Sequence, residues 1–386
     1  MKFLHLADLH LGKKVNGFRL IEDQRYILKQ VLETLDQEKI DCVLLAGDIY
    51  DSAYPPESAV ELLSFFITEL VNRSCKAVII GGNHDSLERL GFASDVLAHS
   101  GIHFVTSLEK ALEPVVFHDD FGSYNVWALP YFNASSFNLS LDIKVHTSQE
   151  ALDEIVKRIQ AKAEFSDASQ NILMAHLFVT HQSASPESSD SERLVLGTLD
   201  NVEARSFEGF DYVALGHLHK PQKIARDTIR YSGSPLMYSF SELASPKRMI
   251  VVKLEDQSLQ LNEIALKPLY RMQELSGSLD EIVALVPQMD EEARLAYTRV
   301  TLTDELEPLD ALETLKSYFP HLMILRYDNA RTRAYSENFE LHHESIQKDY
   351  FELFSEFFEL QNGQAMSDEQ AALAKKLYTS IREDEI

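Results

Sequence analysis

Five short motifs carry the carboxylate, imidazole and amide groups that could hold metal ions and hydrolyse an ester. They are Asp8-Leu9-His10, Gly47-Asp48-Ile49-Tyr50-Asp51, Gly82-Asn83-His84-Asp85, His176 and Gly216-His217-Leu218-His219. Oxygen and imidazole donors together suit Mn, Fe or Zn better than Mg or Ca. A pair of metals needs a ligand that spans them, and the carboxylate of Asp48 is the candidate bridge. The motifs therefore predict a dimetal hydrolytic site.

Taken alone, each motif has a more ordinary explanation. A single buried histidine such as His176 is more often a satisfied core residue than a ligand. Asp8 could be a helix N-cap and Asn83 a turn residue, and Gly-Asp before the bridge is common turn chemistry. The occurrence of all five motifs in one chain, each after a predicted strand, favours the metal site over these alternatives.

Short apolar runs that alternate with amphipathic stretches predict a parallel sheet with crossover helices. The runs predict strands at 3–7, 42–46 and 77–81, and the stretches predict helices at 21–38 and 57–72. Pro55 and Pro56 stand where the second helix should begin. In open α/β sheets, loops at the carboxyl ends of the strands line the binding crevice, so the motifs are expected to converge.

A second series of apolar runs predicts a second sheet. The runs lie at 125–129, 172–175, 212–215, 229–231, 249–254 and 259–264, and the last two are spaced as antiparallel strands. We therefore expect a four-layer αββα sandwich over residues 1–265. Helix, strand, helix and strand signals at 279–285, 296–302, 309–318 and 323–327 predict a small α+β capping domain over residues 266–335.

Residues 336–386 predict a C-terminal helical segment. Apolar side chains fall on both faces of a predicted helix, namely Tyr350, Phe351, Leu353, Phe354, Phe357, Phe358 and Leu360. That is too much apolar surface for a solvated helix. The helix should dock either in the groove of a partner or on the small domain, and a further amphipathic stretch follows at 368–382.

The composition is that of a globular protein with an acidic surface. Of the 386 residues, 45% are hydrophobic and 25% charged, and the net charge is -25. An autonomous DNA-binding domain usually has the opposite sign. Bound divalent cations would make the site locally positive, however, and a basic partner subunit could supply phosphate contacts.

We expect a cytoplasmic protein without a membrane span. The first residues show no export signal. Apolar runs such as 43–46 and 77–80 stop far short of the roughly 20 residues that cross a bilayer. Cys42 and Cys75 lie in or beside such runs, where a buried apolar role is favoured.

The motif order DxH, GDxxD, GNHD, H, GHxH resembles the calcineurin-like metallophosphoesterase family over residues 1 to about 265. Neighbouring segments are similar to the bacterial nuclease subunits of that family. These segments are HLADLHLGKKVNGF, AGDIYDSAYPP, GGNHDS, MAHLFVT, SDSERLVLGTLD, DYVALGHLHKPQ and YSGSPLMYSFSE. The similarity extends through the small domain and the C-terminal segment.

The resemblance implies two divalent ions, for which we expect Mn²⁺, and it implies their ligands. One ion would be held by Asp8, His10, Asp48 and His219, and the other by Asp48, Asn83, His176 and His217. His84 would assist the departure of the leaving oxygen. Asp51 and Asp85 would orient an imidazole or close the loop. His181 receives no role, and a surface position is expected for it.

The resemblance further implies 3′ to 5′ exonuclease action on duplex ends and endonuclease action on single strands, in DNA repair, recombination and hairpin processing. It implies an SMC-like ATPase partner and a homodimer, for which helices around 57–72 and 87–99 are candidates. The main alternative is a phosphatase or small-molecule phosphodiesterase on the same core. Phosphatases of the family place Arg in two motifs where Ser52 and Asp85 stand here. The other alternative, a catalytically silent scaffold, does not fit a complete ligand set.

Overall fold

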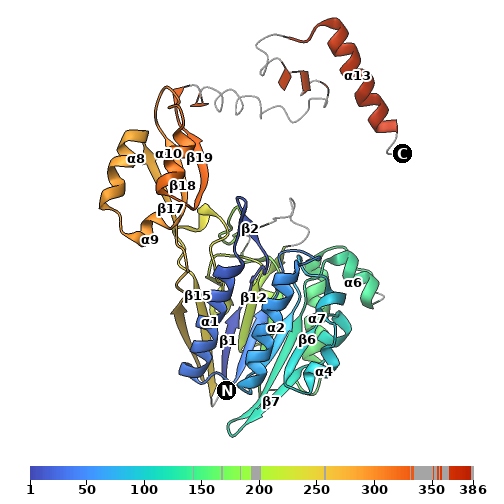
Figure 1. Cartoon of the computed structure of the whole chain (residues 1–386). Coiled ribbons are helices and arrows are strands. Elements are labelled where there is room, and N and C mark those ends of the chain that lie inside the picture. The colour runs from blue at the N-terminus through green and yellow to red at the C-terminus, as the bar shows by residue number, and fades with distance from the viewer. Residues whose placement is uncertain are drawn as a thin grey trace. The chain divides into compact units, whose positions relative to one another are not determined.

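The structure is a computed structural model of the chain (Figure 1). It describes residues 1–141, 143–166, 168–182, 184–192, 201–255, 258–330, 332–333, 351, 354–355, 357–358 and 365–383. The chain divides into two compact units. The first comprises Met1–Ser276, Asp280–Val300 and Asp310–Leu325, and the second comprises Gly277–Leu279, Thr301–Leu309 and Arg326–Ile386.

Two six-stranded sheets form the body of the first unit. One sheet has the order β16-β15-β1-β4-β5-β6, with strands Ser258–Ala265, Arg248–Glu255, Lys2–Leu6, Cys42–Ala46, Lys76–Ile80 and Ile102–Val105. Its strands β1, β4, β5 and β6 are parallel, whereas β15 and β16 add an antiparallel edge.

The second sheet has the order β13-β14-β12-β9-β8-β7. Its strands are Gln222–Ile224, Arg226–Tyr231, Tyr212–Gly216, Ser169–His176, Gly122–Leu129 and Val115–Asp119. Strands β8, β9, β12 and β14 are parallel, and β7 and β13 close the two edges antiparallel to their neighbours. Both sheets therefore point several parallel strands toward one edge.

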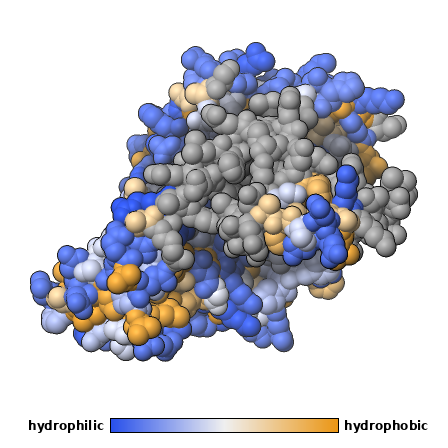
Figure 2. Space-filling model, turned by 90° about the horizontal axis from the view of Figure 1, so that it is seen from above, coloured by the Kyte–Doolittle hydropathy of each residue, from blue (hydrophilic) through white to orange (hydrophobic). Residues whose placement is uncertain are grey.

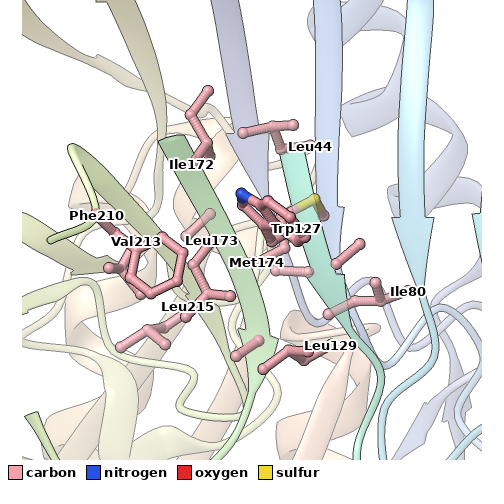
Figure 3. Close-up of a cluster of buried hydrophobic side chains, with 14 of the residues drawn as sticks. Leu44, Ile80, Trp127, Leu129, Ile172, Leu173, Met174, Phe210, Val213 and Leu215 are labelled. Carbon is pink, nitrogen blue, oxygen red and sulfur yellow. The ribbon is translucent and has the colours of Figure 1, made fainter. Parts of the chain in front are cut away.

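Alternation along the strands explains the layers. Leu44 and Ile80 of the first sheet share a core with Trp127 and Met174 of the second (Figure 3). Their neighbours in sequence, such as Leu45, point the other way and pack with the helices α1 (Ile21–Glu38) and α2 (Glu57–Asn72). Helix α7 (Ser148–Gln160) buries its apolar face in the core cluster that contains the second sheet. The arrangement is the expected αββα sandwich.

Shorter elements complete the first unit. They are β2 (Lys14–Val15), β3 (Phe18–Arg19), α3 (Leu87–Leu90), α4 (Ser94–Ala98), α5 (Leu108–Ala111), α6 (Ala134–Leu141), β10 (Val179–Thr180), β11 (Val202–Glu203), η1 (Ala204–Phe207) and η2 (Phe240–Glu242). The later part of the chain forms a three-stranded sheet with helices. Its elements are β17 (Met272–Gly277), α8 (Leu279–Leu285), η3 (Val286–Gln288), α9 (Glu291–Arg294), β18 (Tyr297–Leu302), α10 (Ala311–Tyr318) and β19 (Leu322–Tyr327). Helix α13 (Asp368–Glu383) follows.

The predicted helices at 21–38 and 57–72 are confirmed residue for residue, and every predicted strand of the sandwich is present. Strands β6, β7, β13 and β17, the short strands β2, β3, β10 and β11, and helices α6 and α7 were not predicted. The predicted helix over 350–360 lies largely outside the described residues, and the division into three domains stays a prediction. Cys42 and Cys75 are buried and unbridged, as expected.

Seen from above, the coloured surface is mostly hydrophilic, with separate hydrophobic patches (Figure 2). Within the described part of the chain, no helix combines the length and apolar character of a membrane span.

Candidate metal centre

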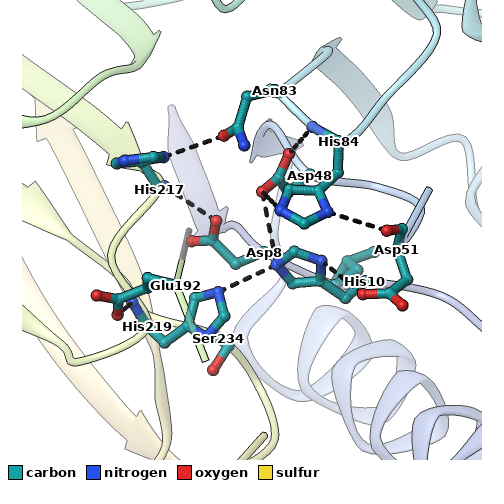
Figure 4. Close-up of polar contacts among 12 residues, drawn as sticks. Asp8, His10, Asp48, Asp51, Asn83, His84, Glu192, His217, His219 and Ser234 are labelled. Carbon is teal, nitrogen blue, oxygen red and sulfur yellow. Dashed lines mark hydrogen bonds and ion pairs between the residues drawn. The ribbon is translucent and has the colours of Figure 1, made fainter. Parts of the chain in front are cut away.

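The five motifs follow the carboxyl ends of neighbouring strands in both sheets, and their side chains meet there (Figure 4). The ligand candidates come from the following strands: Asp8 and His10 after β1, Asp48 after β4, Asn83 after β5, His176 at the end of β9, and His217 and His219 after β12. All seven candidates and His84 thus lie at one edge. The convergence expected from strand ends is what the structure has.

Left-handed backbone turns aim four of these side chains. The φ angles are 54° at Asp8, 43° at His10, 49° at Asp48 and 106° at His217, values that non-glycine residues rarely adopt. In extended backbone the i, i+2 spacing of the Asp-x-His and His-x-His pairs would point both side chains of a pair to the same side, but Asp8, His10 and His217 are not extended. Strained turns aim these side chains instead, and such strain typically marks functional sites.

Two motif glycines are required by close approach. A Cβ atom on Gly82 would lie 2.1 Å from Asp48 Oδ1, and one on Gly216 would lie 1.8 Å from the carbonyl oxygen of Ala46. Any side chain at either position would push the ligand loops apart. This explains the glycines of the GNHD and GHLH motifs in physical terms.

The carboxylate of Asp48 lies at the centre of the site. Its Oδ2 is 3.4 Å from His176 Nε2, 3.5 Å from His10 Nε2 and 4.0 Å from His84 Nε2. Its Oδ1 accepts a hydrogen bond of 2.9 Å from the backbone N–H of His84. Asp48 thus faces imidazoles from both sides, as a bridging ligand must.

On one side of Asp48 lie Asp8, His10 and His219. Their ligand atoms are all within 4.8 Å of one another, and the two imidazole Nε2 atoms are 3.0 Å apart. Asp8 Oδ1 accepts a hydrogen bond of 2.9 Å from the N–H of His217, but Asp8 Oδ2 is buried without a hydrogen-bond partner. A buried unpartnered carboxylate oxygen is costly, and a cation would satisfy it. The donor set therefore fits a metal ion.

On the other side lie Asn83, His176 and His217. Asn83 Oδ1 is 3.1 Å from both His176 Nε2 and His217 Nδ1. The carbonyl of Ala46 lies 2.9 Å from His176 Nδ1 and can only accept, so Nδ1 carries the proton. The lone pair of a neutral His176 then sits on Nε2, facing Asn83 and Asp48. This is the orientation of a metal ligand.

Burial and neighbouring charge set the protonation of the site. Burial lowers the pKa of both His217 and His219 to about 3, which keeps their lone pairs available for a metal. Burial also lowers the pKa of His176, but the adjacent Asp48 outweighs it and raises that pKa to about 9.

The two carboxyl groups shift in opposite directions. Burial raises the pKa of Asp8 well above its usual value. Burial acts in the same sense on Asp48, but His176 outweighs it and holds the pKa of Asp48 well below its usual value. A bound dication would favour the ionised form of both groups.

Asp51 and Asp85 make the contacts expected of supporting residues. Asp51 Oδ1 lies 3.4 Å from His10 Nδ1 and 2.6 Å from Lys13 Nζ, and the Asp51 carbonyl lies 2.9 Å from His84 Nδ1. Asp85 accepts hydrogen bonds from three backbone N–H groups, those of Ile49, Tyr50 and Gly82. Asp51 therefore lies beside the imidazoles of His10 and His84, and Asp85 links the loop after β4 to the loop after β5. His181 is exposed.

Sequence comparisons place the site in a family. The family model described as calcineurin-like phosphoesterase matches residues 1–221, and that described as type 5 capsule protein repressor C-terminal domain matches residues 268–362. The SbcD component of the nuclease SbcCD from Staphylococcus epidermidis is 34% identical over 100% of both chains. The chain belongs to the SbcD nuclease family. The SbcD component from Staphylococcus saprophyticus is 31% identical over 100% of this chain and 99% of the other.

As a member of the SbcD family, the chain is a metal-dependent nuclease on a calcineurin-like phosphoesterase fold, and divalent metals belong to its chemistry. Among solved structures, a dimetal phosphatase from Danio rerio aligns with a TM-score of 0.43 at 12% identity, covering 70% of this chain and 98% of that one.

Sequence reasoning missed the residues behind His219. Ser191 Oγ lies 2.6 Å from His219 Nδ1, and Glu192 accepts a hydrogen bond of 2.7 Å from the His219 N–H. Glu242 and Lys247 are buried behind Ser191. Ser191, Glu192 and Glu242 lie within two segments that are similar to the SbcD family, SDSERLVLGTLD and YSGSPLMYSFSE, but no local pattern assigns them a role.

Proposed function

We propose that this chain hydrolyses DNA phosphodiesters with two divalent metal ions, Mn²⁺ in the first instance, as a 3′ to 5′ duplex exonuclease and single-strand endonuclease. One ion is held by Asp8, His10, Asp48 and His219, and the other by Asp48, Asn83, His176 and His217. The observation that carries this proposal is the buried carboxylate of Asp48, which faces imidazoles from both sides.

Two divalent ions bound here would activate a water molecule and offset the charge of the phosphate. The protein's part is to hold eight side chains in a fixed, mostly buried frame. His84 completes this frame. Its backbone N–H donates to Asp48, and its Nδ1 faces the carbonyl of Asp51, so the ring is fixed with Nε2 toward the site. Because Nδ1 faces an acceptor and carries one proton, Nε2 has a proton to give only when both ring nitrogens are protonated; we assign to His84 in this form the delivery of the Nε2 proton to the leaving oxygen.

A phosphodiester is favoured over a monoester because the positions that carry Arg in related phosphatases hold Ser52 and Asp85. Both oxygens of Asp85 accept backbone hydrogen bonds, and the hydroxyl of Ser52 donates to the carbonyl of Tyr54. Neither side chain supplies the positive fork that a monoester dianion would require.

The substrate proposal is tested with the full-length chain, Mn²⁺ and three substrates: a linear duplex, a single strand and an aryl phosphate monoester. Cleavage of both DNA substrates should exceed that of the monoester. Omission of metal, or a chelator, should abolish it. Preference for the monoester would reject the nuclease proposal in favour of a phosphatase.

We further propose that the chain acts with an SMC-like ATPase, SbcC, because the names of its relatives place them in the SbcCD nuclease. Residues 1–265 form the nuclease domain, 266–335 a capping and DNA-binding domain, and 336–386 the segment that binds the ATPase. Phe354, Phe357 and Leu373 in that segment are exposed by 47%, 53% and 59%, which supports docking on a partner. Deleting residues 345–386 should abolish SbcC binding and spare hydrolysis of a small diester.

A homodimer is the remaining part of the proposal. Exposed apolar side chains cluster in and near the candidate helices, with Tyr54 exposed by 76%, Phe92 by 83% and Val96 by 72%. Light scattering should report a dimer. Phe92→Glu should give a monomer, whereas Leu139→Glu, at an equally exposed position on α6, should not. A monomeric wild-type chain would contradict this assignment.

A further inference from the structure

A chain of buried polar side chains runs back from one proposed ligand. Ser191 Oγ lies 2.6 Å from His219 Nδ1 and donates a hydrogen bond of 2.7 Å to Glu242 Oε1. The other carboxylate oxygen of Glu242 accepts from Lys247 Nζ. These groups join the 3-10 helix η2 and the residue before β15 to the segment that contains Ser191. Buried polar groups are costly unless all of them are hydrogen-bonded, so a network of this size behind one imidazole indicates a function.

The direction of the hydrogen bonds fixes the proton of His219. The Ser191 hydroxyl has one proton and three neighbours, namely His219 Nδ1, Glu242 Oε1 and Ser189 Oγ at 2.8 Å. Ser189 has a hydroxyl proton of its own and can donate to Ser191, whereas the carboxylate of Glu242 can only accept, so Ser191 donates to Glu242. Toward His219 the hydroxyl oxygen can therefore only accept, so Nδ1 of the imidazole carries the proton. The lone pair of neutral His219 is then on Nε2, which faces the proposed metal site.

The carboxylate at the end of this chain is held ionised. The ion pair with the buried ammonium of Lys247 stabilises the ionised form of the Glu242 carboxylate. Lys247 donates its remaining hydrogen bonds to the carbonyl of His219, at 2.7 Å, and to Ser234 Oγ, at 2.9 Å. All three ammonium protons are thus used, and the ion pair has no spare donor to compete with Ser191.

The imidazole of His10, which faces that of His219, is arranged in the same way, with Nε2 toward the proposed metal site. The carboxylate of Asp51 lies 3.4 Å from His10 Nδ1, which favours a proton there and a lone pair on His10 Nε2. The two Nε2 atoms are 3.0 Å apart. Two lone pairs that face each other at this distance repel, and a shared cation converts that repulsion into coordination.

We propose that Ser191 and Glu242 are positioning residues that set the tautomer of His219, and thereby tune the affinity of the ion held by Asp8, His10, Asp48 and His219. The inference rests on the proposed metal site. It adds that the two ions are tuned separately, because His176 in the other half is oriented by a backbone carbonyl.

The test compares three variants of the full chain. Ser191→Ala removes the hydroxyl, and Ser191→Thr keeps it. Ser241→Ala is the matched control, since its hydroxyl accepts from the N–H of Asp190 in the same loop without touching the imidazole. Glu242→Gln is not used, because it leaves Lys247 buried without its counter-ion.

Mn²⁺ is titrated calorimetrically into each metal-free protein, and the imidazole ¹⁵N spectrum of the metal-free protein reports the tautomer. The His219 signals are identified by their loss in His219→Gln. In Ser191→Ala we expect one of two sites to weaken about 10- to 100-fold and the other to stay unchanged. The Nδ1–H tautomer of His219 should also lose population. Ser191→Thr should restore both properties, and Ser241→Ala should match wild type.

An unchanged tautomer and unchanged affinities in Ser191→Ala would overturn the inference. So would equal weakening of both sites with a lower melting temperature of the metal-free protein, because that pattern indicates general loss of loop packing. A wild-type chain that binds fewer than two ions would contradict the proposed function instead. The tautomer measurement still decides the present inference in that case, because it needs no metal.

Discussion

The two halves of the metal centre differ in what holds their imidazoles. In the first half, formed by Asp8, His10 and His219, side chains from other segments face the Nδ1 atoms of both rings, Asp51 at His10 and Ser191 at His219. In the second half, formed by Asn83, His176 and His217, a backbone carbonyl orients the ring of His176, and Asn83 touches both rings.

The two halves of the metal centre also differ in how deeply their side chains are buried. All three members of the first half are at most 2% exposed, whereas Asn83 and His217 are only partly buried. A side chain that orients an imidazole can be replaced without moving the backbone, whereas a backbone carbonyl that does so cannot. We therefore expect substitutions outside the ligand set to tune the first half and to leave the second nearly constant. Substrate should approach from the more open second half.

Replacing Asp48 with Asn should have the largest effect because this carboxylate faces both halves. We expect metal binding to fall below two ions per chain and DNA hydrolysis to drop at least about 10⁴-fold, roughly 5.4 kcal/mol of barrier. Calorimetry and a nuclease assay measure the two effects. Asp36→Asn, which removes a surface partner of Arg73, is the control and should behave as wild type. Near-normal cleavage by Asp48→Asn would refute the bridging role.

His84→Gln tests whether His84 donates a proton to the leaving oxygen or binds a metal ion. His84 lies within 4.8 Å of ligand atoms on His10 and Asp48, so it could hold a metal by geometry alone. If His84 is the proton donor, its replacement should leave two ions bound per chain and reduce cleavage about 10²- to 10⁴-fold. Metal content and cleavage are measured on the same samples. Retained Mn²⁺-dependent cleavage would refute the catalytic role, and loss of one ion would make His84 a ligand.

The sequence predicts that the ligand candidates converge, because their position depends only on the strand that each of them follows. A strand that ends in a polar motif places that motif at the sheet edge, and this holds for Asp8, Asp48, Asn83 and His217 without knowledge of the whole fold. The same reasoning predicts α1 and α2, whose apolar residues recur at helical spacing. Helix α7 has that spacing and an N-cap at Thr147, and could have been predicted from them.

The support of the first half could not be predicted in this way. Ser191 meets Glu242 and Lys247 only after its segment packs against η2 and the residue before β15, and no periodic pattern in the sequence links these residues to Ser191. Backbone strain is equally hidden, because nothing in the residue type of His10 or Asp48 announces a positive φ. Long-range packing decides both features.

Gly82→Ala tests how tightly the two halves are joined. The added Cβ would lie 2.1 Å from Asp48 Oδ1 and 2.4 Å from the Asp48 nitrogen, so the bridge must move. We expect a loss of about 1–3 kcal/mol in stability from overpacking, with weaker binding of both ions. Gly81→Ala is the matched control, since its Cβ meets Leu87 Cδ2, the end of a flexible side chain. Equal effects of the two substitutions on metal binding would contradict this account.

The smallest effect is expected at His5, which connects the strands that lead to the two halves of the site. This buried imidazole on β1 lies 2.9 Å from the hydroxyl of Tyr212 and 3.2 Å from the carbonyl of Leu215, on the strand that leads to His217. Burial lowers its pKa to about 3. Its folded pKa is therefore below its unfolded value, so protonation favours the unfolded chain, and stability falls as pH drops below about 6.5.

Between pH 6.5 and pH 5 the loss due to His5 should be about 2 kcal/mol. Urea unfolding of the metal-free chain at several pH values measures it, and a chelator removes the contribution of metal release. His5→Gln keeps a polar side chain but cannot titrate, so its stability should fall less steeply over this range than that of wild type. Parallel pH profiles for the two proteins would show that His5 is protonated in the folded state, and the neutral contact to Leu215 would then be wrong.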